Sequence, residues 1–528
     1  MSLLTELFLS RIRVARDIHR HAFRCYGTRT ALLFPERATS YRELQERSYR
    51  LAQAWRALGL KKGDIVFAQV DADPAFFELR IAALEAGIVL ASFHHRHAPD
   101  LLAHAARAAP PALYVVDPGY APGCAEAVRT AAPGTVIWQD PGRPGGDYET
   151  SLATRAPLQS SETVHPRDPM SLGFTSGTTG PPKGLLSSNG AAVASLKLII
   201  RNLNIRPDRK ARNVSLSAIP LTGAGSGLIL PTMLSGGTLV VMREHSTAAI
   251  LESISRHRVT RLFLTPSQLV DLLDLPPGER AATDSLEHII YGTAPMPAAR
   301  LREAIATFGP ILQQGYGQAE VLPPVSLLRP QDHMRGDRPA PRRVLRSCGR
   351  VVKGVELRIA GARRVPGCHD AVGAIHVRTP TRFSGYLEPA RNGGVILDDG
   401  YFVTGDHGFI DDEGYLHVLG REAEIIDSPA GPIHPRLVEE EAHEHPAVKE
   451  CCLVEHAGKR VLCLALRSRH RQGRKDEIAA EVGVTLRAAL PEALRPDRIV
   501  IFPALPRSFL CKIAPRDIRR KLADEHAA

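Results

Sequence analysis

The sequence FTSGTTGPPKG at residues 174–184 combines three glycines, four hydroxyl side chains and one lysine in eleven positions. It follows the apolar, strand-like segment 170–174 and precedes AAVASLKLIIRNL, residues 191–203, whose apolar positions recur with helical spacing. Ser188 and Asn189 are candidate caps for this helix. A strand, a glycine-rich turn and a helix direct backbone N–H groups toward an anion. The segment therefore predicts a phosphate-binding loop, and a solvated linker is the alternative.

The residue types of this segment suit a phosphate. Gly177, Gly180 and Gly184 would let the backbone approach the ligand closely, and Lys183 would bring a positive charge. The pattern is not a Walker loop, because Gly184 follows the lysine where that motif has the Ser or Thr that holds a metal. Hydroxyl donors would come from Ser176, Thr178 and Thr179.

The composition is that of a globular chain with two or more domains: 528 residues, of which 44% are hydrophobic and 23% charged. Its eight cysteines are scattered without a Cys-x-x-Cys pattern, which favours a reduced cytoplasmic protein over a disulfide framework or a zinc site. Glu6 and Arg11 interrupt the N-terminal apolar residues, so we expect no signal peptide. The uncharged stretch 213–242 contains prolines and glycines, and we expect buried strands joined by turns there instead of a membrane span.

The net charge of +11 raises the question of nucleic-acid binding. Basic residues are spread along the chain, and the densest segment, 338–350, has no interleaved aromatic motif. We therefore expect an Arg-rich surface that steers anionic substrates, and neither a nucleic acid nor a membrane as a partner. The segment FHHRH, with His94, His95 and His97, suggests a metal, but adjacent histidines rarely chelate one ion. Substrate-facing or surface histidines are the expected alternative.

Periodicity divides the chain into three parts. In the earlier part of the chain, helical patterns alternate with short apolar runs, which favours α/β layers with parallel sheets. The runs GVELRIA, AVGAIHVRTP and GYLHVLGR that follow are short and alternating, as in antiparallel strands. After Arg421 a smaller segment has strands and helices of its own, and it has the size of a separate domain.

Six segments, in chain order, resemble the motifs of the acyl-adenylate-forming (AMP-binding, ANL) superfamily, which includes acyl-CoA synthetases, luciferases, adenylation domains and amide bond synthetases. They are FTSGTTGPPKG (174–184), YGTAPMP (291–297), GYGQAE (315–320), YFVTGDHG (401–408), GREAEIIDSPAGPIHP (420–435) and LPRSFLCKIAPRDIRRKL (505–522). The resemblance implies an enzyme that joins a carboxylic acid to the α-phosphate of ATP with loss of pyrophosphate. It implies ATP and Mg²⁺ as cofactors.

The resemblance also implies roles for single residues. Lys183, Glu320 and Lys512 would be catalytic, with Glu320 carrying Mg²⁺ and Lys512 bridging the substrate carboxylate and the α-phosphate. Asp406 would accept both ribose hydroxyls, and Arg421 would add a donor. The acid pocket would use Gly223, Ala224 and Val321, with an apolar lining for an aromatic or otherwise hydrophobic acid. The nucleotide would be bound by Thr175, Ser176, Gly177, Thr178, Thr179, Gly180, Gly292, Thr293, Ala294, Gly315, Tyr316, Asp406 and Arg421.

The fold implied by the resemblance is α/β. A large N-terminal adenylation domain, residues 1–420, would consist of layered α/β subdomains with a distorted β-barrel. A small mobile α+β lid, residues 421–528, would carry the catalytic lysine. The enzyme would be a monomer or a homodimer.

The hinge region departs from the superfamily pattern. Ala423 replaces the Asp or Lys that serves as the pivot in thioester-forming relatives. Pro429 and Ala430 stand where relatives tend to have glycines that accommodate the pantetheine arm of CoA, and a rigid proline would crowd that arm. Cys511 replaces a glycine before the catalytic lysine. Elsewhere, Ala319 replaces a threonine.

These departures favour an amine as the final acyl acceptor, as in the amide bond synthetases of antibiotic pathways such as the aminocoumarins. Three alternatives stay open. The acceptor is CoA, which would make the enzyme an acid–CoA ligase, or it is a carrier protein. The remote alternative is a non-catalytic homologue that binds only the nucleotide.

Overall fold

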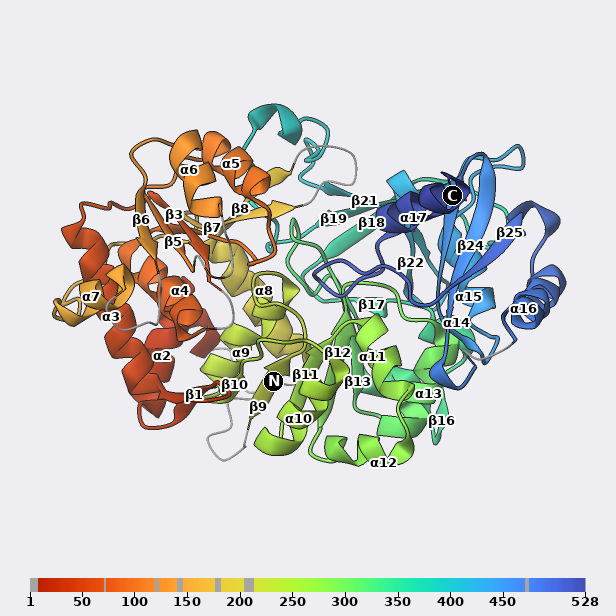
Figure 1. The fold of residues 1–528 in the computed structure, drawn as a ribbon, viewed down its shortest axis with the longest axis horizontal. Coiled ribbons are helices and arrows are strands. Elements are labelled where there is room, and N and C mark those ends of the chain that lie inside the picture. The colour runs from red at the N-terminus through yellow and green to blue at the C-terminus, as the bar shows by residue number, and fades with distance from the viewer. Residues whose placement is uncertain are drawn as a thin grey trace. The chain divides into compact units, whose positions relative to one another are not determined.

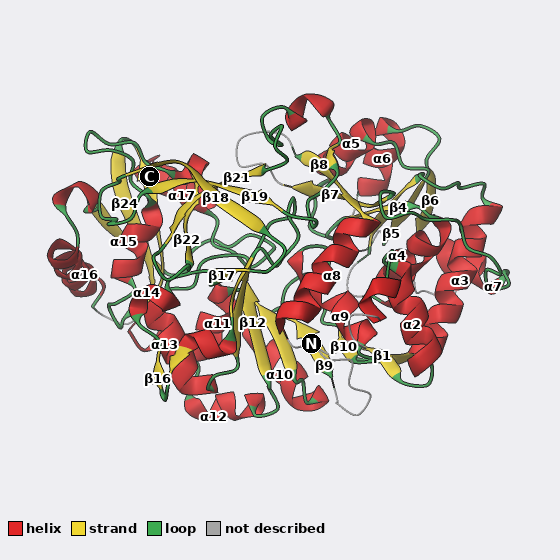
Figure 2. Cartoon of the chain, turned by 180° about the vertical axis from the view of Figure 1, so that it is seen from behind, coloured by secondary structure: helices red, strands yellow, loops and turns green. Residues whose placement is uncertain are grey.

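The computed structural model describes residues 8–70, 73–117, 119, 123–139, 146–175, 182–203, 213–470 and 474–527. The chain forms two compact units, each built from three separate segments. The first unit comprises Met1–Phe263, Gly317–Pro324 and Thr379–Ile396. The second comprises Leu264–Tyr316, Val325–Arg378 and Leu397–Ala528. Figures 1 and 2 show the elements of both units.

A seven-stranded sheet organises the first unit. Its strands, in spatial order, are β20 (Gly385–Tyr386), β8 (Lys183–Ser188), β7 (Pro169–Thr175), β4 (Val89–Ser92), β3 (Ile65–Gln69), β5 (Leu113–Val116) and β6 (Val136–Gln139). The last four are parallel to one another. Helix α3 (Tyr41–Ala57) precedes β3, the intervening helices are α4 (Pro74–Ala86), α5 (Pro99–Ala108) and α6 (Cys124–Ala131), and α7 (Asp147–Ala153) follows β6.

Both faces of this sheet are covered by helices. Val66 of β3 belongs to an apolar cluster with Leu79 of α4, whereas the next residue, Phe67, packs in a cluster with Leu102 of α5. Successive strand residues point to opposite faces, so helices lie on both sides of the sheet, as Figure 2 shows for α4 and α5. The predicted α/β layers with parallel strands are confirmed.

A second group of strands in the first unit has the order β2 (Ala38–Ser40), β1 (Thr30–Leu33), β10 (Thr238–Val240), β9 (Val214–Ser217) and β11 (Arg261–Leu264). Helices α2 (Arg16–Tyr26) and α10 (Thr247–His257) belong to the same unit. The expectation of strands in the stretch 213–242 is correct only at its ends. Between β9 and β10 the chain forms η1 (Ala224–Leu228) and α9 (Ile229–Leu234), because a short apolar run does not distinguish a buried strand from a buried helix. No helix within the described ranges is long and apolar enough to cross a membrane.

The predicted strand–turn–helix arrangement around the glycine-rich segment is wrong. After β7 the chain returns as the antiparallel strand β8, and only then does α8 (Asn189–Leu203) begin. Ser188 accepts a hydrogen bond from the Ala191 amide, so the predicted cap is correct. The segment therefore connects two neighbouring strands, with Thr175 opposite Lys183, and it does not lead into the N-terminus of a helix.

The second unit begins with α/β elements. Strands β12 (His288–Gly292) and β13 (Leu312–Tyr316) are parallel, and β14 (Ser326–Leu328) and β17 (Arg350–Val351) extend the pair in antiparallel fashion. The helices are α11 (Pro266–Leu273), α12 (Pro277–Arg280), α13 (Ala298–Phe308) and α14 (Arg342–Leu345). A small ribbon is formed by β15 (Met334–Arg335) and β16 (Arg338–Pro339).

An antiparallel sheet follows, in the order β18 (Glu356–Arg363), β19 (Val372–Arg378), β21 (Phe402–Ile410) and β22 (Leu416–Arg421). It contains the three alternating runs, so the prediction of antiparallel strands is confirmed. The C-terminal elements are α15 (Pro435–Ala442), β23 (Val448–His456), β24 (Lys459–Leu466), α16 (Lys475–Ala489), β25 (Arg498–Phe502) and α17 (Pro515–Ala527). The three strands form one sheet, and the expected small α+β arrangement is therefore present.

The C-terminal segment shares an apolar core with the antiparallel sheet. Phe409 of β21 and Val372 of β19 lie in one buried cluster with Val438 of α15 and Leu464 of β24. A boundary between 420 and 421 stays a prediction, because these contacts join both sides of it within the second unit.

Candidate active site

In the first unit, the side chain of Tyr386 links Glu320 and Lys183, and the three residues come from three separate segments. Tyr386 of β20 donates a hydrogen bond from its hydroxyl to Glu320 Oε1 at 3.0 Å. The Lys183 ammonium, at the start of β8, lies 5.2 Å from the centroid of the Tyr386 ring. Tyr386 thus contacts a carboxylate through its hydroxyl and a cation through the face of its ring. Two of the three, Lys183 and Glu320, are residues that the sequence predicts to be catalytic.

Backbone pairing fixes this cluster. The Glu320 carbonyl accepts a hydrogen bond from the Phe383 amide at 2.7 Å, three residues before Tyr386. Tyr386 is paired with Leu185 in the antiparallel register of β20 and β8. A side chain at Gly184 would approach Leu387 to 3.1 Å, so glycine there permits the strands to meet. The sequence did not predict Tyr386, because it lies in none of the motif segments.

In the second unit, Asp406 of β21 is the centre of a second cluster. The Tyr316 hydroxyl donates to Asp406 Oδ2 at 2.6 Å, and Arg421 Nε lies 3.0 Å from Oδ1. Asp406 and Arg421 are directly paired across β21 and β22, and Arg421 also donates to the Thr404 carbonyl at 3.0 Å. Burial, followed by the Asp406 charge, raises the pKa of Tyr316 well above its ordinary value, so its hydroxyl stays a donor. The carboxylate keeps lone pairs for further donors.

Lys512 belongs to this second cluster. Burial, followed by repulsion from Arg421, lowers the pKa of Lys512, while Asp406 acts in the opposite direction. The preceding turn is held by a hydrogen bond from the Ser508 amide to the Lys512 carbonyl at 2.7 Å, and by one from the Thr265 hydroxyl to the Cys511 carbonyl at 3.2 Å. The structure thus brings together Lys512, Asp406, Arg421 and Tyr316, which the sequence assigned to one site.

The ends of β12 and β13 suit a flat ligand. Gly292 and Gly315 are paired in register, and a Cβ on Gly292 would lie 2.9 Å from the Gly315 carbonyl oxygen. Thr293 then has a φ of 74°, a conformation that is uncommon for residues other than glycine. Its hydroxyl is buried and makes no hydrogen bond within the described ranges. A nucleotide would supply the missing partner, so the residues present fit the ATP that the motifs imply. Ala294 follows in the same loop.

The remaining predicted residues have mixed outcomes. Ser176, Gly177, Thr178, Thr179 and Gly180 lie outside the described residues, as does the side chain of Thr175, whose backbone ends β7. For the acid pocket, Gly223 immediately precedes η1 and is half-buried, and Ala224 begins η1 and is exposed. Val321 is fully buried and bridges to Arg382. All of these assignments remain predictions.

Glu320 fits the magnesium that the motifs imply. Within the described ranges no cluster of three or more His, Cys, Asp or Glu residues could form a complete protein cage for a metal. Mg²⁺ is usually held by one or two carboxylates together with substrate phosphates, so the Glu320 carboxylate, in one cluster with the Lys183 ammonium through Tyr386, suits a metal–phosphate ligand.

The predicted hinge residue Ala423 lies in the single turn η5 (Glu422–Glu424). The loop beyond it is closed by paired hydrogen bonds between Ile426 and Ile433, at 3.0 and 2.9 Å. Within it, the Ser428 hydroxyl donates to the Gly431 carbonyl at 2.6 Å, and the Gly431 amide donates back to Ser428 at 3.0 Å. Pro429 and Ala430 occupy the tip of this turn, where proline restricts the backbone further.

Comparison with known proteins defines the class. The AMP-binding enzyme family matches residues 19–387, and the AMP-binding enzyme C-terminal domain matches residues 437–509. The chain therefore belongs to the AMP-binding enzyme family, the acyl-adenylate-forming superfamily that its motifs resemble. It is an AMP-forming carboxylate ligase.

The individual relatives use different acyl acceptors. The chain is 28% identical over 515 residues to an indoleacetate–CoA ligase of Aromatoleum aromaticum, covering 96% of this chain and 97% of the relative. An anthranilate CoA ligase solved with anthranoyl-AMP has a TM-score of 0.85 at 21% identity, covering 98% of both chains. An amide bond synthetase of Marinactinospora thermotolerans has a TM-score of 0.80 at 26% identity, covering 96% of this chain and 99% of that one. These matches confirm the predicted fold class.

Proposed function

We propose that this enzyme uses ATP and Mg²⁺ to activate an aromatic or otherwise hydrophobic carboxylic acid, and that it transfers the acyl group to an amine. In the first step a carboxylate oxygen attacks the α-phosphorus of ATP and pyrophosphate leaves. In the second the amine nitrogen attacks the acyl carbon, AMP leaves, and an amide forms. Both steps depend mostly on positioning and on electrostatic stabilisation.

The first cluster serves the phosphates in this proposal. When bound, Mg²⁺ would neutralise phosphate charge, and Glu320 would hold it. The Lys183 ammonium would attract a phosphate oxygen as a point charge. Tyr386 keeps the Glu320 carboxylate oriented through its 3.0 Å hydrogen bond, and its ring face lies against the Lys183 ammonium.

The second cluster serves the nucleoside and the reacting carboxylate. Asp406, oriented by Tyr316 and Arg421, would accept hydrogen bonds from the ribose hydroxyls. Lys512, which lies within electrostatic range of Asp406, would donate to the substrate carboxylate and to the α-phosphate. In its protonated form it would offset the negative charge that accumulates at the phosphorus.

The choice of an amine rests on the closed loop at Pro429. In a thioester-forming enzyme the pantetheine arm of CoA must pass close to such a loop. Here the loop is tied by the Ile426–Ile433 and Ser428–Gly431 hydrogen bonds, and its tip carries two side chains instead of glycines. Ala423 at the hinge has no charged or polar group that could stabilise an alternative lid position.

Ion pairs within the second unit support the same choice. Each joins a residue after position 421 to one between 264 and 346, so a rotation of the C-terminal segment would break them. Individually such pairs contribute little, but several acting together hold one orientation. They are Arg507–Asp271 at 2.6 Å, Arg302–Glu444 at 2.7 Å, Arg467–Glu303 at 2.8 Å, Lys449–Asp271 at 2.9 Å, Arg342–Glu441 at 2.9 Å and Lys449–Asp274 at 3.1 Å.

Thioester formation is the second candidate, because several of the relatives are CoA ligases. The deciding experiment first measures acid-dependent exchange of pyrophosphate into ATP across aromatic and aliphatic acids. CoA or a panel of amines is then added with the best acid, and the products are identified by mass spectrometry. We expect exchange, an amide with an amine, and no acyl-CoA at turnover rates.

Acyl-CoA formed at turnover rates would overturn the amide proposal and leave the adenylation step intact. A matched variant sharpens the comparison: Ala423→Asp combined with Pro429→Gly and Ala430→Gly restores the residue types found in thioester-forming relatives. We expect this variant to gain acyl-CoA formation while its exchange rate stays the same. An equal effect on both reactions would show that the loop does not select the acceptor.

A further inference from the structure

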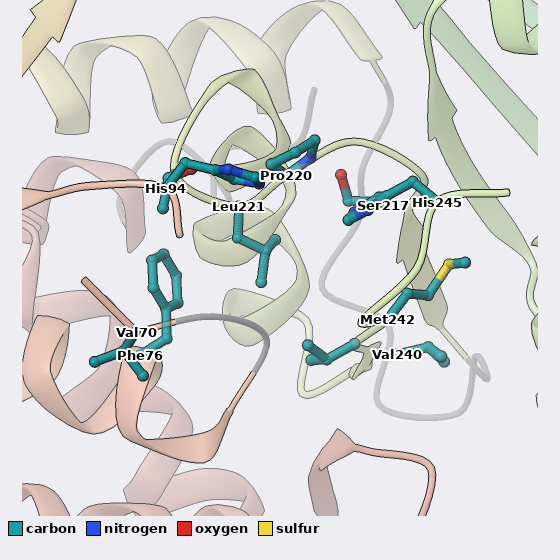
Figure 3. A pocket seen from close by; sticks show the side chains of 11 residues that line it. Val70, Phe76, His94, Ser217, Pro220, Leu221, Val240, Met242 and His245 are labelled. Carbon is teal, nitrogen blue, oxygen red and sulfur yellow. The ribbon is translucent and has the colours of Figure 1, made fainter. Parts of the chain in front are cut away.

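The cavity in Figure 3 lies in the first unit and is too small for a substrate. Figure 3 shows His94 and His245 along its upper side and Val240 and Met242 along its lower side. Its volume of about 20 Å³ leaves room for about one water molecule. The contacts that extend the proposed mechanism lie in the second unit, around Lys512.

The turn that carries Lys512 is a hairpin that spans residues 506–514. The Ser508 amide donates a hydrogen bond to the Lys512 carbonyl at 2.7 Å, and the Ala514 amide donates to the Pro506 carbonyl at 2.9 Å. Lys512 is therefore fixed within the hairpin. Its place in the second unit depends on the contacts that hold the hairpin itself.

The base of this hairpin is held on both of its arms. Arg507 donates two hydrogen bonds to the Asp271 carboxylate of α11, at 2.6 and 3.1 Å, and one to Glu450 at 2.7 Å. Ile513, which pairs with Arg507 across the hairpin, packs against an apolar cluster that includes Ile518 of α17. The base is thus attached both to α11 and to the C-terminal core.

Thr265 holds the tip of the hairpin. Its buried hydroxyl donates to the Cys511 carbonyl at 3.2 Å, and Cys511 directly precedes Lys512. The same hydroxyl oxygen accepts from the Gln268 amide at 3.2 Å and so caps α11. Gln268 Oε1 also lies 3.1 Å from the hydroxyl, but it already accepts from the Thr265 amide at 3.0 Å. The hydroxyl can therefore act on two elements at once, as an acceptor for α11 and as a donor for the hairpin.

The hydrogen bond from Thr265 restrains the peptide group that joins Cys511 to Lys512. A peptide group is planar, so restraining its oxygen also restrains the Cα atom of Lys512. Cys511 has a φ of 58°, in the left-handed region that disfavours residues with a side chain. Burial, followed by repulsion from Arg421, lowers the pKa of Lys512, so its charged form would be more favourable in water. Both effects favour movement of the lysine away from its position, and the hydrogen bond opposes that movement.

We propose that Thr265 is a positioning residue for Lys512, and that its hydroxyl holds the hairpin so that the ammonium lies where the acid carboxylate meets the α-phosphate. The inference rests on the proposed role of Lys512 in adenylation. It adds a residue that none of the six motif segments contains. Thr265 acts through Lys512, and its effect falls on the rate of adenylation, because a misplacement of about 1 Å can cost about a hundredfold in rate.

The test compares two substitutions of one residue. Thr265→Val removes the hydroxyl and keeps the shape, whereas Thr265→Ser keeps the hydroxyl. Pyrophosphate exchange is measured with the acid that reacts fastest among benzoate, 4-hydroxycinnamate, indoleacetate and octanoate. We expect Thr265→Val to lower kcat about tenfold, the size predicted for one lost buried hydrogen bond. The KM for ATP should not change, because Tyr316 and Asp406 still bind the nucleotide, and Thr265→Ser should restore kcat.

Ser246→Ala controls for the loss of a helix cap. Ser246 caps α10 in the first unit by accepting a hydrogen bond from the Ala249 amide at 3.3 Å. Like Thr265→Val, this substitution should lower the melting temperature, since an N-cap side chain stabilises its helix. It should leave kcat unchanged. An equal fall in kcat would show that helix capping, and not the bond to Cys511, accounts for the effect.

A labelling experiment examines Lys512 without turnover. Acetic anhydride reacts with neutral amines, so acetylation of Lys512, measured against pH by mass spectrometry, gives the pKa of this residue. Exposed Lys353 is the internal standard. In the wild-type protein we expect a lowered pKa, because the side chain is buried near Arg421. Thr265→Val should raise the pKa of Lys512 toward the ordinary lysine value, whereas Thr265→Ser and Ser246→Ala should leave it unchanged.

Three results would overturn the inference while adenylation stands. They are an unchanged kcat in Thr265→Val, a loss of kcat in Thr265→Ser as large as that in Thr265→Val, and a pKa of Lys512 that stays lowered in Thr265→Val. If no acid in the panel supports exchange, the proposed function fails. The labelling experiment then still shows whether Thr265 holds Lys512 in place.

Discussion

The Tyr316 hydroxyl and the Asp406 carboxylate are 2.6 Å apart, although ninety residues separate them in the chain. Tyr316 ends a parallel strand, and Asp406 lies in the antiparallel sheet. The hydrogen bond therefore fixes the carboxylate relative to the loop that carries Gly292 and Thr293, within the second unit. Asp406 is held from two sides, because Arg421 contacts its other oxygen.

Tyr316→Phe should weaken ATP binding without unfolding the protein. A hydrogen bond to a charged group contributes about 1.5–3 kcal/mol, so we expect the KM for ATP to rise at least about tenfold. Steady-state pyrophosphate release measures this. Tyr401→Phe is the control. It removes an exposed hydroxyl that lies 3.4 Å from Glu356 of β18, and it should leave the KM for ATP unchanged. Equal effects of the two substitutions would contradict the assigned role.

Lys512→Met should abolish adenylation and raise the melting temperature. Because the pKa of Lys512 is lowered in the folded state, its charged form is less favourable there than in the unfolded chain. The residue therefore destabilises the fold at neutral pH, and this penalty decreases as the pH rises above the lowered pKa and is gone above the ordinary lysine pKa of the unfolded chain. Lys449→Met is the control with the opposite expected effect on stability, because Lys449 forms ion pairs with Asp271 and Asp274 that the substitution removes. It should lower the melting temperature and retain exchange activity.

Glu320→Gln should increase the Mg²⁺ concentration needed for half-maximal exchange about tenfold or more, because an amide oxygen is a weaker ligand for a hard cation. Tyr386→Phe should cause a smaller increase, since the carboxylate remains and only its orientation is lost. Titration of Mg²⁺ at fixed ATP checks both. Glu388→Gln is the control, because it removes an exposed carboxylate that pairs with Arg391. If it raised the Mg²⁺ requirement as much as Glu320→Gln does, Glu320 would not be a specific metal ligand.

Cys511→Gly should stabilise the protein relative to Cys511→Ala. Cys511 has a φ of 58°, in the left-handed region, which costs a residue with a side chain roughly 1–2 kcal/mol. Both substitutions remove the sulfur, so the difference between their free energies of unfolding, measured in urea, reports the cost of the backbone conformation at this position. Because glycine also gains entropy in the unfolded chain, a net difference of about 1 kcal/mol is expected. Glycine adopts this conformation without the steric cost that a Cβ brings.

Much of the second cluster could be predicted from the sequence. Asp406, Arg421 and Lys512 each lie in a segment that resembles a superfamily motif, and the structure places them together. The alternating pattern of GYLHVLGR also predicted the strand that aligns Arg421 with Asp406. Motif order and strand periodicity are both visible in a single sequence.

Other features depend on contacts that a sequence does not show. Lys183 was expected just before a helix, but GLLSS is a short segment whose strand character comes from its pairing with β7. Tyr386 lies 66 residues from Glu320, and nothing local marks it.

The hairpin formed by β7 and β8 determines where the Lys183 ammonium can be. Lys183 is opposite Thr175 in an antiparallel ladder, and side chains along a strand alternate between its two faces. Its position on the Tyr386 side is thus set by strand register. Substitutions in the connecting segment leave this register unchanged, whereas an insertion or deletion within the strands would move the lysine to the opposite face.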